Sequence, residues 1–467
     1  MSVRARRMPR RARRALPIVA TGLLCLVATA CTGGSADEPR ASASASASSS
    51  AVSPEPVTLR FSVYGGPEVR KAYRQLAVDY HLDHPEVTVE VEASGDVVTA
   101  RDRLHRHFAA QDPPDLFLAD QTDLAGLVAG DRVQPVDELL EKRGVQFGDN
   151  YQRLGLEAFA ADSALQCMPN EVSPYVVFYN KRLLVPRNLV GPEDEPPTPE
   201  KGWKWEQFEL AARQMSTNGV RGLYLPPRLS TLMPLMRSAG ADIVDDPRKP
   251  TTLTLADDAN REALEQVLTL ARDPNLTPTA RQLSKEDALT RFENGSLGML
   301  VGTRDLVPQL RQNPDLHFDV YPLPSLGQAR TVADVTGYCL SKDTAHVEQA
   351  ADFLAYAAGP KGSKTMAASG GVVPANLAAL HSAQFLEPTQ FPRQGAVFDE
   401  VMRRADSLPS VAGWPSVVTQ TQPYVDRLFT APVLDLDTLL PKVDQVSAEI
   451  LAAAASPSAS PSPSAGD

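Results

Sequence analysis

The chain has 467 residues, of which 43% are hydrophobic and 22% are charged, and its formal net charge is −11 at pH 7. This length allows more than one domain with a core of its own. An acidic chain repels the phosphate backbone of nucleic acids, which argues against nucleic acid as a partner.

The first thirty residues have the composition of an export signal. Seven arginines and no acidic residue precede an apolar run over residues 16–30, which ends in small residues before Cys31. Basic, apolar and small segments in this order are typical of a cleaved signal peptide. The apolar run is shorter than the roughly 20 residues that a membrane-spanning helix needs. We therefore expect residues 1–30 to be removed, and the loss of seven arginines changes the formal net charge from −11 to −18.

Cys31 directly follows the small residues Ala28-Thr29-Ala30. This segment resembles the bacterial lipobox, in which cleavage leaves the cysteine as a lipid-modified N-terminus, although the lipobox prefers leucine where Ala28 stands. An ordinary signal peptide with a chance cysteine is the alternative. Residues 31–55 are rich in Ser and Ala, a composition that cannot bury enough apolar surface to fold. We expect an exported protein, lipid-anchored at Cys31 to the outer face of the cell membrane and followed by a flexible tether.

Residues 57–120 predict strands that alternate with helices. Residues 57–63 and 87–91 alternate apolar and polar side chains, and residues 115–120 form a short apolar run, as strands do. Apolar residues at helical spacing predict helices over 69–80 and 100–108. This β-α-β-α-β order predicts a parallel sheet with helices on both faces and ligands at the carboxyl ends of its strands.

The loops that follow these three strands are therefore the first candidate site. Tyr64 ends the first strand, Asp96 follows the second, and Asp120 and Gln121 follow the third. We expect these four residues to contact a ligand. The alternative for Asp96 and Asp120 is that they cap helices.

Helical patterns dominate residues 206–310, and Pro- and Gly-rich breaks flank and interrupt them. They predict a second lobe. Strand patterns follow at 318–322 and 332–340, and a helix at 346–357. Two lobes imply a cleft between them. From Ser456 onward the chain is Pro, Ser, Ala and Gly, which predicts a disordered tail.

Two cysteines remain in the folded part of the chain. Cys25 lies in the signal peptide and Cys31 takes the lipid, which leaves Cys167 and Cys339. An even number of cysteines in an oxidising compartment permits a disulfide bond. Two separate buried thiols are the alternative.

Six groups of motifs follow one another along the predicted elements. They are the strand-helix-strand opening, Gln111–Asp115, Val176–Leu184, Trp205–Phe208, Phe292–Leu300, and Gly337–Lys342 followed by Ala350–Leu354. In this order they resemble the family of extracellular solute-binding proteins that serve ABC importers for sugars, the group that includes maltose-binding protein. The resemblance implies a type II fold, with two α/β lobes that are joined by hinge strands and close around a solute. It also implies membrane permease subunits of an ABC importer as partners, and we expect a monomer without cofactor, bound metal or catalytic residues.

The extended apolar stretches at 166–178 and 336–340 stand where the chain must change lobes. They divide the body into lobe I (56–168 and 339–390), lobe II (169–338 and 391–453) and a tail (454–467). Cys167 and Cys339 fall on these two stretches. If bridged, they would hold the hinge together while leaving the outer parts of the lobes free to swing.

Sugar sites combine a few polar groups with flat aromatic faces. From the second side of the cleft we expect Ser173, Tyr175, Thr303, Arg304 and Trp414 to contact the solute, with Trp414 on a loop. The alternatives are a core position for Tyr175 and a surface ion pair with the neighbouring aspartate for Arg304.

The family often has tryptophan at the positions of Tyr64 and of residues 303–305. Their replacement here favours a solute that is smaller or more polar than a long oligosaccharide.

Three other functions compete with solute transport. A metal-binding lipoprotein is suggested by four histidines in the first lobe, but those at 105 and 107 diverge on a helix. A glycoside-acting enzyme needs two carboxylates that face each other across a sugar, which pairs such as Asp245-Asp246 in a Pro-rich loop do not indicate. A pair of lobes that serves a sensor is the third alternative.

Overall fold

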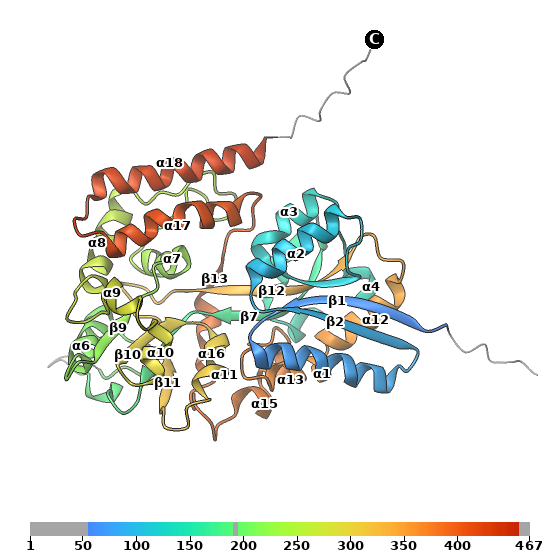
Figure 1. Ribbon diagram of the computed structural model, residues 1–467, viewed down its shortest axis with the longest axis horizontal. Helices are drawn as coiled ribbons and strands as arrows, with labels where there is room; N and C mark the ends of the chain where they lie inside the picture. The colour runs from blue at the N-terminus through green and yellow to red at the C-terminus, as the bar shows by residue number, and fades with distance from the viewer. Residues whose placement is uncertain (1–54, 190–194, 457–467) are drawn as a thin grey trace, which may run out of the picture. The chain divides into compact units, whose positions relative to one another are not determined.

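The computed structural model describes residues 55–189 and 195–456. Within these ranges the chain forms a seven-stranded sheet, a four-stranded sheet and a short two-stranded hairpin, with helices around both larger sheets (Figure 1). The predicted signal peptide, the proposed anchor Cys31 and nearly all of the predicted tether and tail lie outside the described residues. The mixed α/β architecture confirms the predicted fold class.

The seven-stranded sheet contains the predicted β-α-β-α-β opening. Its order is β13-β12-β3-β1-β2, with β4 and β7 also paired to β12. The neighbouring strands β2, β1 and β3 are parallel, with β2 at the edge of the sheet, whereas β12 runs antiparallel to β3. Its strands are β1 (Val57–Tyr64), β2 (Val87–Ser94), β3 (Leu116–Asp120), β4 (Val133–Gln134), β7 (Cys167–Pro174), β12 (Thr331–Ser341) and β13 (Ala405–Ser407).

Helices cover both faces of this sheet because each presents an apolar stripe at helical spacing. In α1, for example, Tyr73, Leu76 and Tyr80 are buried on one side. The helices that follow the strands of this sheet are α1 (Pro67–Asp83), α2 (Val97–Ala109), η1 (Gln121–Asp123), α3 (Leu124–Ala129), α4 (Asp137–Glu141), η2 (Gly148–Asn150), α5 (Arg153–Ala158), α12 (Val347–Ala358) and α13 (Pro360–Ala367). The hairpin β5 (Ala160–Ala161) and β6 (Ala164–Leu165) precedes β7.

The four-stranded sheet has the order β11-β8-β10-β9 and separates two apolar cores. Its strands are β8 (Val176–Asn180), β9 (Arg221–Tyr224), β10 (Leu297–Gly302) and β11 (Phe318–Tyr321). Its helices are η3 (Pro186–Asn188), α6 (Trp205–Met215), α7 (Leu229–Ser238), α8 (Asp258–Ala271), α9 (Ala280–Leu283), α10 (Ala288–Glu293), η4 (Arg304–Leu306), α11 (Val307–Leu310), α14 (Leu377–Leu380), α15 (Ala383–Leu386), α16 (Val397–Glu400), η5 (Val401–Arg404), α17 (Trp414–Thr430) and α18 (Leu436–Ala455).

The C-terminal helices α17 and α18 run side by side and pack on the core that also holds α6, α7 and α8 (Figure 1). Helix α18 continues to Ala455, two residues into the predicted tail. Residues 377–398, most of which were assigned to lobe I, contribute Leu380, Phe385 and Phe398 to the core on the other face of the four-stranded sheet. Chain order alone does not reveal this return, because the segment packs on strands that precede it by about 60 to 200 residues.

Two long strands, β7 and β12, connect the two sheets. They pair antiparallel from Cys167 with Cys339 to Pro174 with Ala333, and β8 begins two residues after β7 ends. The predicted lobe boundaries at 168/169 and 338/339 fall inside this pair of strands. β7 and β12 therefore occupy the place that was predicted for hinge strands.

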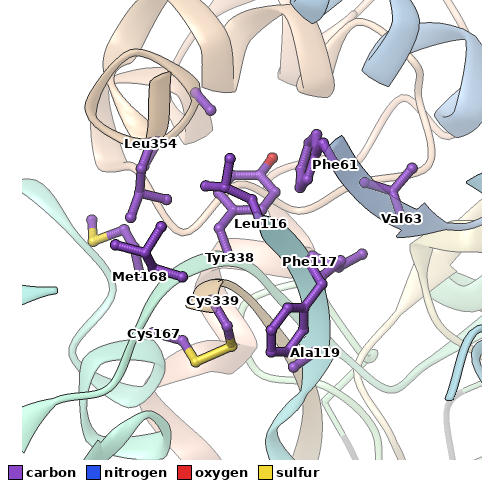
Figure 2. Packing of buried hydrophobic residues seen from close by; sticks show 14 of the residues in the cluster. Phe61, Val63, Leu116, Phe117, Ala119, Cys167, Met168, Tyr338, Cys339 and Leu354 are labelled. Carbon is purple, nitrogen blue, oxygen red and sulfur yellow. A yellow bond between two sulfur atoms is a disulfide. The ribbon is translucent and has the colours of Figure 1, made fainter. Parts of the chain in front are cut away.

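Cys167 and Cys339 form a disulfide bond with a Cα–Cα distance of 4.4 Å. They are directly opposite each other in the β7–β12 ladder. Figure 2 shows the bond beside Phe117 and Ala119 of β3, in the apolar core of the seven-stranded sheet. The bond ties the two connecting strands together at the end of their ladder that is farther from the four-stranded sheet.

Candidate functional site

Three strands of the four-stranded sheet bring polar residues to one edge. β9 and β10 are parallel, so their carboxyl ends, at Tyr224 and Gly302, reach the same edge. β8 runs antiparallel to β10 and pairs Val176 with Gly302, so Tyr175 lies there too. Loops at the carboxyl ends of parallel strands are the usual place for ligands in α/β proteins.

These residues line a cavity of about 670 Å³, which we call the acidic cavity. Asp334 of β12 contributes to its wall, so strands of both sheets border the same space. The lining residues are Tyr175, Tyr224, Pro226, Pro227, Arg228, Asp287, Ala288, Leu289, Leu300, Val301, Gly302, Thr303, Asp305, Leu306, Asp334, Gln422 and Asp426. A cavity of this volume is large enough for a small polar solute.

Asp334 is fixed by a direct contact within the wall of this cavity. The Tyr175 hydroxyl donates a hydrogen bond to Asp334 Oδ2 at 3.1 Å. Burial raises the pKa of Asp334 to about 7, and the neighbouring Asp120 and Asp305 carboxylates raise it as well, whereas the Tyr175 hydrogen bond and the Arg228 charge act in the opposite direction. The carboxyl group therefore holds its proton more strongly than an exposed aspartate does.

Two more acids lie beside Asp334 on the seven-stranded sheet. Thr336 of β12 pairs with Asp120 of β3 on one side and with Glu171 of β7 on the other, and Asp334 pairs with Ser173. Directly paired residues and every second residue of a strand point to the same face. Asp334, Thr336, Asp120 and Glu171 therefore share one face of the sheet.

Glu171 is the most strongly perturbed acid of this group. Burial raises its pKa to about 8, the charges of Asp305 and Asp334 add to the effect, and a hydrogen bond from the Val373 amide to Glu171 Oε1 at 3.3 Å opposes it. The Thr336 hydroxyl beside it is buried without a hydrogen-bond partner among the described residues. Strongly raised acid pKa values mark this edge of the sheet as a candidate functional site.

A second space, the apolar cavity, has a volume of about 840 Å³ and lies between α2, η1, α3 and the start of α17. Tyr64 lines it, and so do Phe108, Leu127 and Val411. Its charges are matched, since Arg101 Nε and Asp123 Oδ1 form an ion pair at 2.6 Å. Although this cavity is larger, its acidic and basic side chains are balanced, and we therefore take the acidic cavity as the candidate site.

The predicted site residues separate into three groups. Tyr175 and Thr303 line the acidic cavity, and Tyr64 lines the apolar cavity with its hydroxyl buried. Ser173 is buried directly opposite Asp334. Ser173 therefore lies beside the acidic cavity that Tyr175 and Thr303 line, and the contact of all three residues with a solute stays a prediction.

A second group has local structural roles. Asp96 is exposed and caps α2 by accepting hydrogen bonds from the Thr99 amide and hydroxyl, both at 2.8 Å. Asp120 caps η1 by accepting from the Thr122 amide at 2.9 Å. Gln121 is fully buried and donates from Nε2 to the Leu408 carbonyl at 2.9 Å. Asp96 and Gln121 line neither cavity.

The expectations for Arg304 and Trp414 need correction. Both side chains are only 1% exposed and line neither cavity, so no surface remains for a solute. Arg304 donates from Nε to the Gly370 carbonyl at 3.1 Å, and it does not pair with a neighbouring aspartate at the surface. Trp414 is not on a loop, because it begins α17 after Gly413, whose φ of 86° turns the chain into the helix, and it packs in the core below.

Sequence reasoning missed the acids at 171 and 334. Both lie inside predicted extended stretches, where an acid is normally assigned to a solvated face. Asp334 has Val332, Ala333 and Val335 around it, and an acid inside an otherwise apolar run is the one signal that pointed to a special position. The pairing of β7 with β12, about 160 residues apart, could not be read from either segment.

Metal-binding clusters and membrane-spanning helices are both absent from the described residues. Among residues 55–189 and 195–456, no group of three or more His, Cys, Asp or Glu side chains is arranged to hold a metal ion. No helix in the same ranges is both long and apolar enough to cross a membrane.

Two helix-flanked sheets, joined by strands and bordering one polar cavity, define a two-lobed binding protein. Residues 75–393 match the family of bacterial extracellular solute-binding proteins, and the chain belongs to this family. The family assigned from the sequence is thus confirmed. No curated protein sequence matches the chain significantly.

Solved structures share the fold at low sequence identity. An ABC substrate-binding protein of Listeria monocytogenes, in complex with cycloalternan, is 20% identical with a TM-score of 0.73, over 85% of this chain and 98% of that chain. The GacH receptor of Streptomyces glaucescens, solved unliganded and with acarbose, is 15% identical with a TM-score of 0.71, over 85% and 99%. The maltotriose-binding protein of Thermus thermophilus is 16% identical with a TM-score of 0.67, over 84% and 99%.

Proposed function

We propose that this protein captures a carbohydrate-like solute in the acidic cavity and delivers it to the permease subunits of an ABC importer. The observation that carries the proposal is the acidic cavity itself, where Tyr175, Tyr224 and Thr303 from one sheet face Asp334 from the other. Aromatic rings and hydroxyl or carboxylate groups are the partners that a sugar ring needs. The similar proteins solved with cycloalternan, acarbose and maltotriose support a carbohydrate.

The mechanism in this proposal is conformational. A solute that touches both sheets favours the arrangement in which the sheets approach each other, because only that arrangement makes all of its contacts. The long strands β7 and β12 would absorb the motion, as hinge segments do. The proposed activity makes and breaks no covalent bond.

A thermal-shift screen tests this function directly. The protein from residue 55 onward is heated with sugars, polyols, amino acids and metal salts, and a bound solute raises the midpoint by mass action. We expect a rise with at least one sugar or sugar derivative. A response to zinc alone, with indifference to every carbohydrate, would contradict the proposal and support metal binding.

A hydrolysis assay separates binding from catalysis. Aryl glycosides are incubated with the protein, and released aglycone is measured over hours. We expect no turnover, because the proposed role needs only binding. Turnover that is lost in Asp334→Asn or Asp305→Asn would instead support a glycoside-acting enzyme.

Anchoring at Cys31 completes the proposed function. A tethered binding protein is held near its membrane partner at a high effective concentration. The test is fractionation of cells that express the full chain or the Cys31→Ala variant. We expect the parent in the membrane fraction and the variant in the soluble exported fraction, whereas equal distribution would contradict the lipid anchor.

A further inference from the structure

The charged side chains that line the acidic cavity are strongly unbalanced. They are Asp287, Asp305, Asp334, Asp426 and a single cation, Arg228. In the apolar cavity, by contrast, acidic and basic side chains are matched by an ion pair between Arg101 and Asp123. The acidic cavity therefore presents an excess of negative charge to anything that enters it.

Two of the four acids already serve as local structural groups. Asp287 caps α10 by accepting from the Thr290 amide at 2.9 Å and from its hydroxyl at 2.8 Å. Asp426 accepts from Gln422 Nε2 at 2.8 Å. Their charges are partly satisfied without a ligand.

The other two acids keep a carboxylate oxygen available. Asp334 uses Oδ2 for the Tyr175 hydroxyl, and Asp305 uses Oδ1 for the Thr303 hydroxyl. No hydrogen bond to Asp334 Oδ1 or Asp305 Oδ2 is present in the described part of the chain. Asp334 belongs to the seven-stranded sheet and Asp305 follows strand β10 of the four-stranded sheet by three residues, so the two acids reach the cavity from different sheets.

A second polar group without a partner among the described residues lies two residues from Asp334 on the same strand, although it does not line the acidic cavity. Thr336 is only 8% exposed, its hydroxyl has no partner within residues 55–189 and 195–456, and it shares the face of β12 with Asp334. Buried hydroxyls are rarely left without a hydrogen bond. Its neighbours across the ladder are the acids Asp120 and Glu171.

We propose that the carbohydrate-like solute carries a protonated amine, which Asp334 and Asp305 bind together from the two walls of the acidic cavity. The inference rests on the proposed function above and names the chemical class of its solute. A single ammonium group supplies up to three hydrogen-bond donors and one positive charge, which matches two acids that each have an available oxygen. A neutral sugar would bring no positive charge to a cavity whose acidic side chains outnumber its basic ones.

Proton exchange gives the proposal a specific signature. Asp334 lies near Asp120, Asp305, Tyr175 and Arg228. Burial raises the pKa of Asp334 to about 7, and the Asp120 and Asp305 carboxylates add to this effect. Glu171 faces Asp305, Asp334, Ser173 and the Val373 amide. A bound cation favours the charged form of these carboxyl groups. Binding of the amine therefore releases protons to the buffer, and binding of an uncharged analogue does not.

The experiment is isothermal titration with matched solutes. Glucosamine, N-acetylglucosamine and glucose form one set, galactosamine, N-acetylgalactosamine and galactose a second, and the trimer of glucosamine with maltotriose a third. At about pH 6, where the amines are protonated, we expect the amino form to bind about tenfold more tightly than its neutral partners. Titrations in two buffers of different ionisation enthalpy report the released protons.

Variants assign the effect to the two acids. Asp334→Asn and Asp305→Asn keep the size and the hydrogen bonds of the side chains and remove the negative charge. We therefore expect each variant to bind the amino form about tenfold more weakly than the parent does. Its affinity for neutral sugars should change by less than about threefold. The control is Glu90→Gln, at an exposed position of β2. It should leave all affinities unchanged.

The outcomes distinguish this inference from the proposed function. If neutral and amino sugars bind with equal affinity, and both variants lose the same affinity for each, the proposed amine is wrong and carbohydrate capture still holds. If no member of any set binds, both proposals fail. Calcium binding that is lost in Asp334→Asn, tested with calcium chloride alone, would show that the acids hold a divalent cation and would also overturn the amine.

Discussion

Glu171 is a residue of the candidate site that lowers the free energy of unfolding of the ligand-free protein when its carboxyl group is charged. It stands on β7 beside Thr336, and burial raises its pKa to about 8. Its ordinary value is 4.5. The folded protein therefore binds this proton more strongly than the unfolded chain does, so stability decreases as pH rises from about 4.5 through about 8.

Replacing Glu171 by glutamine should raise stability at alkaline pH. The amide keeps an oxygen for the Val373 N–H and removes the charge that must otherwise be buried. We expect the melting temperature of Glu171→Gln to exceed that of the parent by about 2–4 °C at about pH 8.5 and to be nearly equal at about pH 5. Scanning calorimetry at several pH values measures this. The exposed substitution Glu90→Gln is the control, and a gain that is equal at both pH values would contradict the assigned cause.

Arg304 has a different role, since it holds three segments of the core together. It donates from Nη2 to the Phe385 carbonyl at 2.7 Å and from Nε to the Gly370 carbonyl, and its guanidinium lies 4.0 Å from the centre of the Phe385 ring. A planar group with several donors can make these contacts at once, whereas an ammonium group cannot.

The substitution Arg304→Lys should therefore reduce stability and leave binding unchanged. Leaving a buried carbonyl unpartnered and shifting a buried charge costs about 2–4 kcal/mol. Urea denaturation measures the loss, and titration of the folded variant measures solute affinity, which we expect within about twofold of the parent. The control is Arg187→Lys, at an exposed position. Reduced affinity with unchanged stability would instead place Arg304 in the solute site.

Sequence reasoning reached some site residues and not others for a physical reason. Tyr175 and Thr303 were found because they follow or precede strands, and the ends of strands gather at one edge. Asp334 and Glu171 lie within strands, where their direction depends on pairing partners far away in the sequence. Arg304 was misjudged because nothing in its neighbourhood reveals that Phe385 and Phe398 will cover it.

At the scale of elements, β7 and β12 join the two sheets, and the disulfide crosses between them at Cys167 and Cys339. The bond closes a loop of 172 residues, which contains the whole four-stranded sheet. Linking such distant positions removes many conformations from the unfolded chain. This lowers the entropy gained on unfolding and stabilises the fold.

Removing the disulfide should lower stability without removing the site. The double variant Cys167→Ala, Cys339→Ala is expected to lose about 4 kcal/mol, measured by urea denaturation. Solute affinity should change little, because the bond lies in the core around Phe117 and lines neither cavity. As a control, thiol titration of the denatured, unreduced parent from residue 55 onward should find no free cysteine. One or two free thiols would contradict the bond.

The elements themselves were predictable to different degrees. The strands and helices from β1 to β3 were predicted because alternation and helical spacing are clear there. β9 and β10 were absorbed into a helical region, since Arg221–Tyr224 is too short to show alternation and Leu297–Gly302 is a continuous apolar run. Buried strands of this kind are recognised by their neighbours in the sheet, which the sequence does not display.

At the scale of the whole molecule, the acidic cavity makes solute capture a property of both sheets. Asp334 comes from one sheet, whereas Tyr224 and Thr303 come from the other, and β7 and β12 are the continuous strands between them. A solute held by both walls contributes binding free energy only when the walls are close enough for simultaneous contact. Binding and closure are therefore linked by the same contacts.

Solute should accordingly make the protein more compact in solution. We expect small-angle X-ray scattering to show a smaller radius of gyration for the chain from residue 55 when its solute is saturating, because closure brings the two sheets together. The double variant Asp305→Asn, Asp334→Asn keeps its fold but loses contacts on both walls, so it should remain at the larger value with the same solute concentration. If the solute contacts only one wall, the parent protein should bind it fully, as measured by titration, and should keep the radius of gyration that it has without solute. That result would restrict the solute to the four-stranded side and would remove the role assigned to Asp334.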